Sequence, residues 1–317
     1  MKSPLSLILL FLVSGQLQAQ THWVSIDEQY GNLPPSFHVY KSTDRIDGKP
    51  NVMYYAIADM GDKELQFTVD TSRGRRLTPD QYFRKDNNPL LIVNACFFSF
   101  ATNENLNLVV KDGRVVSRDP GRLAAKGADS GKYIYPFVGT FGITRSGRPD
   151  IAWVHTTSGS QKVFASQKPV NYILTSDSSL KKRYLLKADG RKFSRWKVQT
   201  AVGGGPVLLQ NGEVKITNNQ ERKFAGKAID DRHPRTAIGY TKDNKIIVFV
   251  CEGRTETAAG LTLTDVANFM RELGCVEALN LDGGGSTTML VNGKEVNTPS
   301  SKGVQRPVPS VFMIKKR

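Results

Sequence analysis

Short runs of alternating apolar and polar residues, separated by two-residue turns, recur along the chain. An alternating run predicts a strand, and a pair of Asn, Asp or Gly residues predicts the tight turn of a hairpin. Strands are also expected in the N-terminal third, at residues 36–40 and 52–69. The pattern predicts four hairpins, at residues 106–117, 206–217, 236–250 and 289–296, with turns at Asp112-Gly113, Asn211-Gly212, Asp243-Asn244 and Asn292-Gly293.

Helices are predicted at only two places. Residues 262–273 begin with Thr262 and place Asp265 three positions later, which is a capping box, and Gly274 follows as a stop signal. A second, short helix is expected at residues 78–83, where Thr-Pro begins the turn.

The longer predicted helix connects two apolar strands, residues 246–251 and 275–281. The predicted fold class is therefore α+β, with mixed, mostly antiparallel sheets and one right-handed β-α-β crossover near the C-terminus. Parallel strands end at the same edge of a sheet, where ligands bind in open α/β sheets. Glu252 and Arg254 follow the first strand and Asp282 follows the second, so we expect two acids and a cation at this edge.

A run of small residues follows Asp282, namely Gly283, Gly284, Gly285, Ser286 and Thr287. Consecutive glycines let a ligand approach the main chain, and successive free N–H groups form a concavity that binds anions. The run is not a Walker P-loop, because no Lys follows at the required spacing, and no helix follows as in a dinucleotide motif. The alternative is a tight turn or bulge that Asp282 caps.

Three further positions suit phosphate or ligand recognition, each with a structural alternative. Gly204 lies in a second glycine cluster, which alone predicts a turn before a strand. Arg235 follows Pro234 at a strand start and could bind phosphate through two donors, although most Arg side chains are solvated. Asn94 ends the apolar run 89–93, and a buried amide needs a ligand or a structural partner.

Two hydrolase classes lack their residues. The four His are dispersed and form no His-x-x-x-His pair, so a zinc hydrolase has no ligand set. No Gly-x-Ser-x-Gly elbow occurs, which weakens a serine esterase. Chemistry by carboxylates, Asp282 and Glu252, remains.

The order of these segments resembles the phosphodiester glycosidase family. The resemblance is strongest in RTAIG at 235–239, EGR at 252–254, GLTL at 260–263, LG at 273–274 and ALNLDGGGS at 278–286, and it continues through VNTPS at 296–300 to RPV at 306–308. Earlier, NACFF at 94–98 is similar to the family's NGGFF, and VGGGP at 202–206 to its GGP segment.

The resemblance implies hydrolysis of a sugar-1-phosphodiester, of the GlcNAc-1-phosphodiester kind, to free sugar and a phosphomonoester. The family's usual DGR is here Glu252-Gly253-Arg254, and the usual Gly-Gly after Asn94 is Ala95-Cys96, so the resemblance implies the reaction class but not the choice of substrate. The residues that fall on family motif positions are Asn94, Arg235, Asp282, Gly283, Gly284, Gly285, Ser286 and Arg306.

We expect Arg235, with Arg254 or Arg306, to clamp the phosphate while main-chain N–H groups of residues 283–287 share its charge. Asp282 or Glu252 is expected to act as base toward water or as nucleophile, and Asp282 is favoured because it lies next to the glycine run and matches the family without substitution. No cofactor is required, although a divalent cation at Asp282 is an option. The alternatives are a phosphodiesterase that cleaves P–O with the same clamp, and a non-catalytic protein that binds anionic glycans.

The net positive charge of the chain suggests different partners depending on where the protein is located. Lys and Arg number 44 against 29 Asp and Glu, a net +15 that suits nucleic acid, an anionic surface or an acidic substrate. Residues 1–19, with Lys2, an apolar run at 5–13 and Ala19, resemble a cleavable signal peptide. Residues 20–317 are then one exported domain, periplasmic or secreted, without a transmembrane span. Its expected partners are phosphate-bearing glycans, not nucleic acid.

The chain has three cysteines. Cys251 should end one strand of the crossover and Cys275 begin the other, which places them at opposite ends and too far apart for a disulfide. Cys96 lies inside the Asn94 motif. No disulfide is therefore expected.

Overall fold

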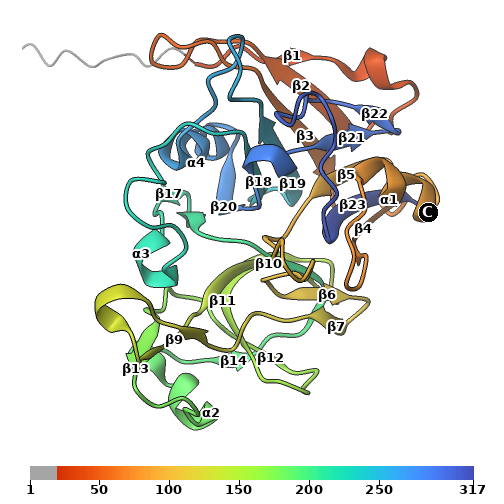
Figure 1. Ribbon diagram of the computed structural model, residues 1–317. Helices are drawn as coiled ribbons and strands as arrows, with labels where there is room; N and C mark the ends of the chain where they lie inside the picture. Colours follow the sequence, from red (N-terminus) through yellow and green to blue (C-terminus); the bar gives the residue numbers. More distant parts are fainter. Residues whose placement is uncertain (1–19) are drawn as a thin grey trace, which may run out of the picture.

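The computed structural model describes residues 20–317, so the predicted signal peptide, residues 1–19, lies outside the described part of the chain. Strands dominate, as Figure 1 shows. The helices are α1 (Pro79–Lys85), α2 (Lys182–Leu185), α3 (Asn218–Glu221) and α4 (Leu263–Glu272), with 3-10 turns η1 (Asp27–Tyr30), η2 (Gly127–Asp129), η3 (Ala188–Gly190) and η4 (Gly284–Ser286). No helix in residues 20–317 has the length and apolar character that crossing a bilayer requires.

The strands of residues 20–317 form four sheets. The eight-stranded sheet has the order β1 (Val24–Ser25), β2 (Phe37–Ser42), β3 (Met53–Asp59), β19 (Lys245–Cys251), β18 (Arg235–Thr241), β20 (Cys275–Asn280), β16 (Val207–Gln210) and β17 (Glu213–Val214). The five-stranded sheet has the order β22 (Lys294–Glu295), β21 (Met289–Val291), β5 (Leu91–Asn94), β23 (Ser310–Lys316) and β4 (Leu65–Thr71).

The other two sheets lie in the half of the molecule drawn below β18–β20 in Figure 1. The seven-stranded sheet has the order β14 (Ser194–Arg195), β12 (Val163–Ser166), β11 (Pro149–Thr156), β10 (Val138–Thr144), β15 (Val198–Gly203), β6 (Val109–Lys111) and β7 (Arg114–Ser117). The three-stranded sheet has the order β13 (Ile173–Thr175), β9 (Tyr133–Tyr135) and β8 (Leu123–Ala124).

The four predicted hairpins are confirmed, since β6–β7, β16–β17, β18–β19 and β21–β22 are antiparallel neighbours. In three of the turns both central residues have positive φ, as a type I′ turn requires. These turns are Asp112-Gly113, Asn211-Gly212 and Asn292-Gly293.

Both predicted helices are also confirmed. The Thr262 hydroxyl accepts the Asp265 N–H at 3.0 Å, and the Asp265 carboxylate accepts the Thr262 N–H at 2.9 Å. This capping box starts α4, and Gly274 follows its end with φ 83°. Thr78 caps α1 in the same way, with Gln81 as its partner.

The predicted crossover is only partly seen. Strand β18 lies between β19 and β20 and is antiparallel to both, so these two strands run in the same direction and end at the same edge. They are not hydrogen-bonded neighbours, however, and every ladder in residues 20–317 is antiparallel. Mixed sheets were predicted, but of the predicted parallel pairing residues 20–317 show only the common direction of β19 and β20. The right-handedness of their connection stays a prediction.

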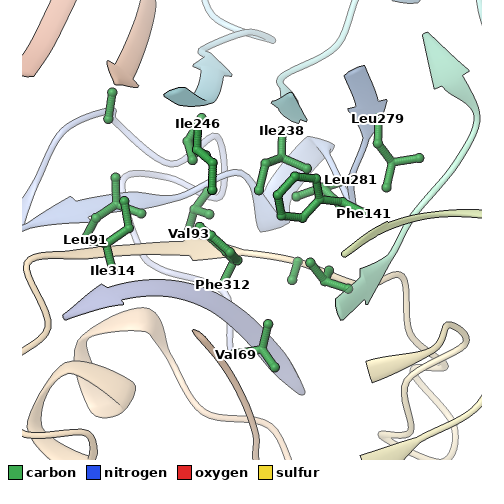
Figure 2. Packing of buried hydrophobic residues seen from close by; sticks show 14 of the residues in the cluster. Val69, Leu91, Val93, Phe141, Ile238, Ile246, Leu279, Leu281, Phe312 and Ile314 are labelled. Atoms are coloured by element: carbon green, nitrogen blue, oxygen red, sulfur yellow. The ribbon is translucent and has the colours of Figure 1, made fainter. Parts of the chain in front are cut away.

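Three sheets share one apolar core, which Figure 2 shows from close by. The eight-stranded sheet contributes Ile238, Ile246 and Leu279, the five-stranded sheet Val69, Leu91, Val93, Phe312 and Ile314, and the seven-stranded sheet Phe141. Burial of these side chains brings the end of β5 next to the end of β20.

The three cysteines are free and buried. On β18, Arg235 pairs with Cys251 at one end and Thr241 pairs with Cys275 at the other. Cys251 and Cys275 therefore lie at opposite ends of the sheet, as predicted.

Candidate active site

Asp282 joins two sheets immediately after β20. Its main-chain N–H donates to the Ala95 carbonyl at 2.9 Å, and its own carbonyl accepts the Asn94 side-chain amide at 2.6 Å. Asn94 is the last residue of β5. The two bonds therefore join the end of the five-stranded sheet to the end of the eight-stranded sheet, and bring together two motifs that are 188 residues apart in the sequence.

The side chain of Asp282 is half-buried. Burial raises the pKa of its carboxyl to about 6, while the Ser286 hydroxyl, Lys223, Arg306 and the Gly283 N–H act in the opposite direction. Such a carboxyl is mainly ionised at pH 7, yet its pKa is close enough to neutrality for proton transfer during a reaction. Asp282 therefore has the properties of a base or a nucleophile.

The glycine run makes room for two guanidinium groups. A Cβ on Gly285 would overlap with the guanidinium of Arg306, and one on Gly284 would lie 3.2 Å from Nη2 of Arg254. Arg306 also donates to the Ser286 Oγ at 3.4 Å. Two of the three arginines predicted to bind phosphate thus flank the run that follows Asp282.

His233 orients Arg254, whose Nε and Nη2 lie 3.4 and 3.3 Å from the His233 Nδ1. Burial lowers the pKa of His233, and the charges of Arg235 and Arg254 lower it further. A neutral imidazole can accept the guanidinium N–H. The sequence contained this His-Pro-Arg segment, but nothing in it indicated the contact with Arg254.

The main-chain N–H groups of the run are used differently from the prediction. The Gly284 N–H donates to the Pro234 carbonyl at 2.8 Å. The Ser286 and Thr287 N–H groups donate to the Gly283 and Gly284 carbonyls at 3.2 Å each, because the run closes into the turn η4. A row of free donors for phosphate is therefore not formed by these three residues. The structural alternative, a tight turn, describes them better.

Arg235 braces a neighbouring loop. Its buried guanidinium donates from Nε to the Leu261 carbonyl at 3.1 Å, and from Nη2 to the carbonyls of Asp231 at 2.7 Å and Ala228 at 3.3 Å. Burial lowers the pKa of Arg235. The structure thus gives this arginine main-chain partners where the sequence predicted a phosphate ligand.

Arg235→Gln is expected to lower the free energy of unfolding by about 2–4 kcal/mol, because the shorter amide leaves buried carbonyls without donors. Urea denaturation followed by circular dichroism measures this. Arg183→Gln, at an exposed position of α2, is the matched control. Unchanged stability of the Arg235 variant, together with weaker phosphate binding, would contradict the bracing role.

Asn94 and Gly204 also have structural partners. The Asn94 Oδ1 accepts the Thr236 hydroxyl at 3.0 Å and the Thr288 N–H at 3.1 Å. A Cβ on Gly204 would overlap with the Asn280 carbonyl oxygen, so only glycine fits there. In both cases the alternative stated from the sequence, a structural role, accounts for the residue.

Glu252 connects a loop to the eight-stranded sheet. Its Oε1 accepts the Thr298 N–H at 2.8 Å and the Tyr54 hydroxyl at 3.4 Å. Burial, and then the negative charge of Glu252, raise the pKa of Tyr54. One oxygen of Glu252 is therefore engaged within the fold, which leaves Asp282 as the stronger candidate for catalysis.

Lys223, which lies just after α3, is a further charged residue near Asp282 that no sequence motif indicated. Its Nζ is 3.7 Å from the centre of the Phe97 ring. Burial lowers the pKa of Lys223 to about 8. The negative charges of nearby acids, mainly Glu221 and Asp282, act in the opposite direction and raise it. Lys223 belongs to no motif and is one of 44 Lys and Arg residues, so only its tertiary position indicates a role.

Asp119 was missed for the same reason. Its Oδ1 accepts the Leu108 N–H at 3.0 Å, whereas its Oδ2 is buried without a hydrogen-bond partner. Burial raises the pKa of Asp119 to about 7, while the Leu108 N–H and the charge of Lys223 act in the opposite direction.

Cys96 also lies near Lys223. Burial raises the pKa of its thiol to about 12, so the thiol is neutral and unsuited to act as a nucleophile.

No group of three or more His, Cys, Asp and Glu side chains suited to holding a metal ion occurs within residues 20–317. A divalent cation at Asp282 would need further oxygen ligands from substrate or water. It stays a prediction.

The site thus combines the carboxyl of Asp282, two guanidinium groups against the glycine turn and the charge of Lys223, a set of groups suited to an anionic ester. The family model "Phosphodiester glycosidase" matches residues 87–315, which is most of the chain. The protein belongs to the phosphodiester glycosidase family, as its motifs indicated.

Several relatives carry the name N-acetylglucosamine-1-phosphodiester alpha-N-acetylglucosaminidase. The mouse protein is 28% identical over 208 residues, 65% of this chain and 32% of its own length. The human protein is 34% identical over 101 residues, 29% of this chain and 19% of its own. The chain thus spans about a third of the length of the mouse relative.

Solved structures show the same fold. The catalytic domain of the zebrafish enzyme of that name, auto-inhibited by its pro-peptide, has a TM-score of 0.60 at 20% identity, covering 94% of this chain and 89% of its own. A hypothetical protein from Synechocystis also gives 0.60, at 17% identity, covering 90% of this chain and 64% of its own.

Proposed function

We propose that the protein hydrolyses a sugar-1-phosphodiester at its glycosidic C–O bond, releasing free sugar and leaving a phosphomonoester. The observation that carries this proposal is the half-buried Asp282, with its raised pKa, beside a turn flanked by the guanidinium groups of Arg254 and Arg306. Relatives in the same family are named for GlcNAc-1-phosphodiesters, so such a diester is the first substrate to test.

The chemistry follows from where charge develops. When the bond from the anomeric carbon to oxygen breaks, its electron pair passes to the phosphate oxygen, and the two guanidinium groups stabilise that charge. Asp282 takes a proton from the attacking water, which inverts the anomeric configuration, or attacks the carbon itself, which retains it. Either step requires the ionised carboxylate.

Lys223 supplies a third cation to this site. Its charge favours the ionised form of Asp282. With a pKa of about 8, Lys223 keeps this charge at neutral pH and loses it in alkaline solution.

We expect kcat/KM to have a bell-shaped pH profile. It falls below about pH 6 because protonation of Asp282 removes the base, and above about pH 8 because Lys223 loses its charge. In Lys223→Arg the side chain stays charged, so the alkaline limb of the profile should move to higher pH and the acid limb should stay in place. An alkaline limb that does not move in this variant would exclude Lys223 as its source.

Oxygen-18 water tests the bond that breaks. Label in the released sugar supports the glycosidase, whereas label in the phosphate supports a phosphodiesterase that uses the same clamp. Salt-sensitive binding of anionic glycans, with no product from any sugar phosphodiester, would favour a non-catalytic binding protein.

Export is a further part of the proposal and rests on the pattern of residues 1–19. Mass spectrometry of the secreted or periplasmic chain should find an N-terminus at Gln20. Chelators should leave activity unchanged if no divalent cation takes part, and phosphate-bearing glycans rather than nucleic acid are the proposed partners.

A further inference from the structure

An aromatic side chain is exposed beside the proposed phosphate site. Phe100 is 64% exposed, in a turn that the Ser99 N–H closes on the Glu104 carbonyl at 3.0 Å. Phe98 is only 8% exposed and packs in an apolar cluster under α1, with its ring centre 4.7 Å from that of Phe100. Phe98 thus anchors the turn, and the turn holds Phe100 toward solvent.

Two guanidinium groups lie against this ring. The Cζ atoms of Arg76 and Arg306 are 5.3 and 5.5 Å from the centre of Phe100, and Arg76 is also 5.4 Å from the centre of Phe98. The ion pairs found within residues 20–317 involve neither arginine. Both cations are therefore available to an anionic ligand.

The fold brings these arginines together from distant parts of the sequence. Leu77 and Val308 form an antiparallel bridge, and the Ser72 N–H donates to the Pro309 carbonyl at 3.0 Å. The segment 72–77 therefore runs beside the segment that contains Arg306. It also carries Arg73 and Arg75, both exposed, so the segment itself is basic.

We propose that Phe100, Arg76 and Arg306 bind the aglycone, and that the aglycone is a sugar carrying an anionic group of its own. Arg306 contacts both the Ser286 hydroxyl and Phe100, so a phosphate bound at Arg306 directs its second ester group toward the ring. The apolar face of a sugar ring can stack on an exposed aromatic side chain, and Arg76 then meets the anionic group. This inference rests on the proposed function and specifies its substrate as an acidic glycan rather than a lipid.

The test compares three GlcNAc-1-phosphodiesters, whose aglycones are methyl, a neutral hexose and a hexuronate. Phe100→Ala should lower the ratio of kcat/KM for the hexose over the methyl diester about ten-fold. Arg76→Gln should lower the ratio for the hexuronate over the hexose about five-fold. Unchanged ratios in both variants would overturn the proposal.

Two controls complete the test. Tyr184→Ala removes an exposed ring, 52% accessible, that pairs with Arg183 at 4.9 Å on α2, and should change none of the ratios. A diester with an octyl aglycone should lose less than the hexose diester in Phe100→Ala, and an equal or greater loss would indicate an apolar aglycone instead.

Calorimetry with the hexuronate phosphomonoester, the product left after cleavage, separates this inference from the proposed function. If the wild-type protein hydrolyses no diester, the proposed function fails. Weaker binding of the phosphomonoester to Phe100→Ala than to Tyr184→Ala would still support the subsite, and equal binding would refute it.

Discussion

Asp282→Asn is expected to lower kcat for a GlcNAc-1-phosphodiester by roughly 10²–10⁴-fold, because an amide can neither accept a proton from water nor attack the anomeric carbon. The fold should be retained, since the bonds that hold this residue to Ala95 and Asn94 come from its main chain. Steady-state kinetics and thermal unfolding of the purified variant measure the two effects separately.

Glu252→Gln is the comparison variant for this experiment. The Gln amide oxygen can still accept the Thr298 N–H, so a moderate change in activity is expected, far smaller than that of Asp282→Asn. Full activity of the Asp282 variant, or a larger loss in the Glu252 variant, would move the catalytic role to Glu252.

Glu221→Gln should produce the largest loss of stability among single conservative changes. The buried Glu221 carboxylate accepts four donors: the N–H groups of Gly139 and Val207, the Trp153 indole and the Thr217 hydroxyl. A Gln side chain turns an NH₂ group toward donors, so we expect the free energy of unfolding to fall by about 3–5 kcal/mol. Guanidinium denaturation measures this change.

The control is Glu213→Gln on β17, where an exposed carboxylate pairs with Lys215 at 2.8 Å. Its unfolding midpoint should hardly move, because an exposed ion pair contributes little. A similar midpoint for both variants would show that the four hydrogen bonds to Glu221 do not stabilise the fold.

Much of the fold could be predicted because its signals are local. Asn211-Gly212 forms its turn wherever it lies, since both residues tolerate positive φ, and Thr262 with Asp265 completes a capping box within one helical turn. The order of the strands within the sheets was harder to predict from the sequence. Placing β18 between β19 and β20 depends on pairing between segments far apart in the chain.

The candidate site also has a part that the sequence could predict and a part that it could not. The sequence indicated Asp282, Arg254 and Arg306 as candidate site residues, and the structure places both guanidinium groups against the glycine run. A side chain's partners, however, are set by what packs around it. Arg235 therefore donates hydrogen bonds to main-chain carbonyl groups. Lys223 lies near Asp282, although it comes from a loop that carries no motif.

The sequence by itself determined the family, the hairpins and the segment that carries Asp282, because motifs and turn residues act over a few positions of the chain. Only the tertiary structure decided which arginines lie against the glycine run and which bond main-chain carbonyls, why Asp282 has a raised pKa, and that Phe100 lies beside Arg306. These properties depend on burial and on contacts between residues distant in the sequence, which no local pattern encodes.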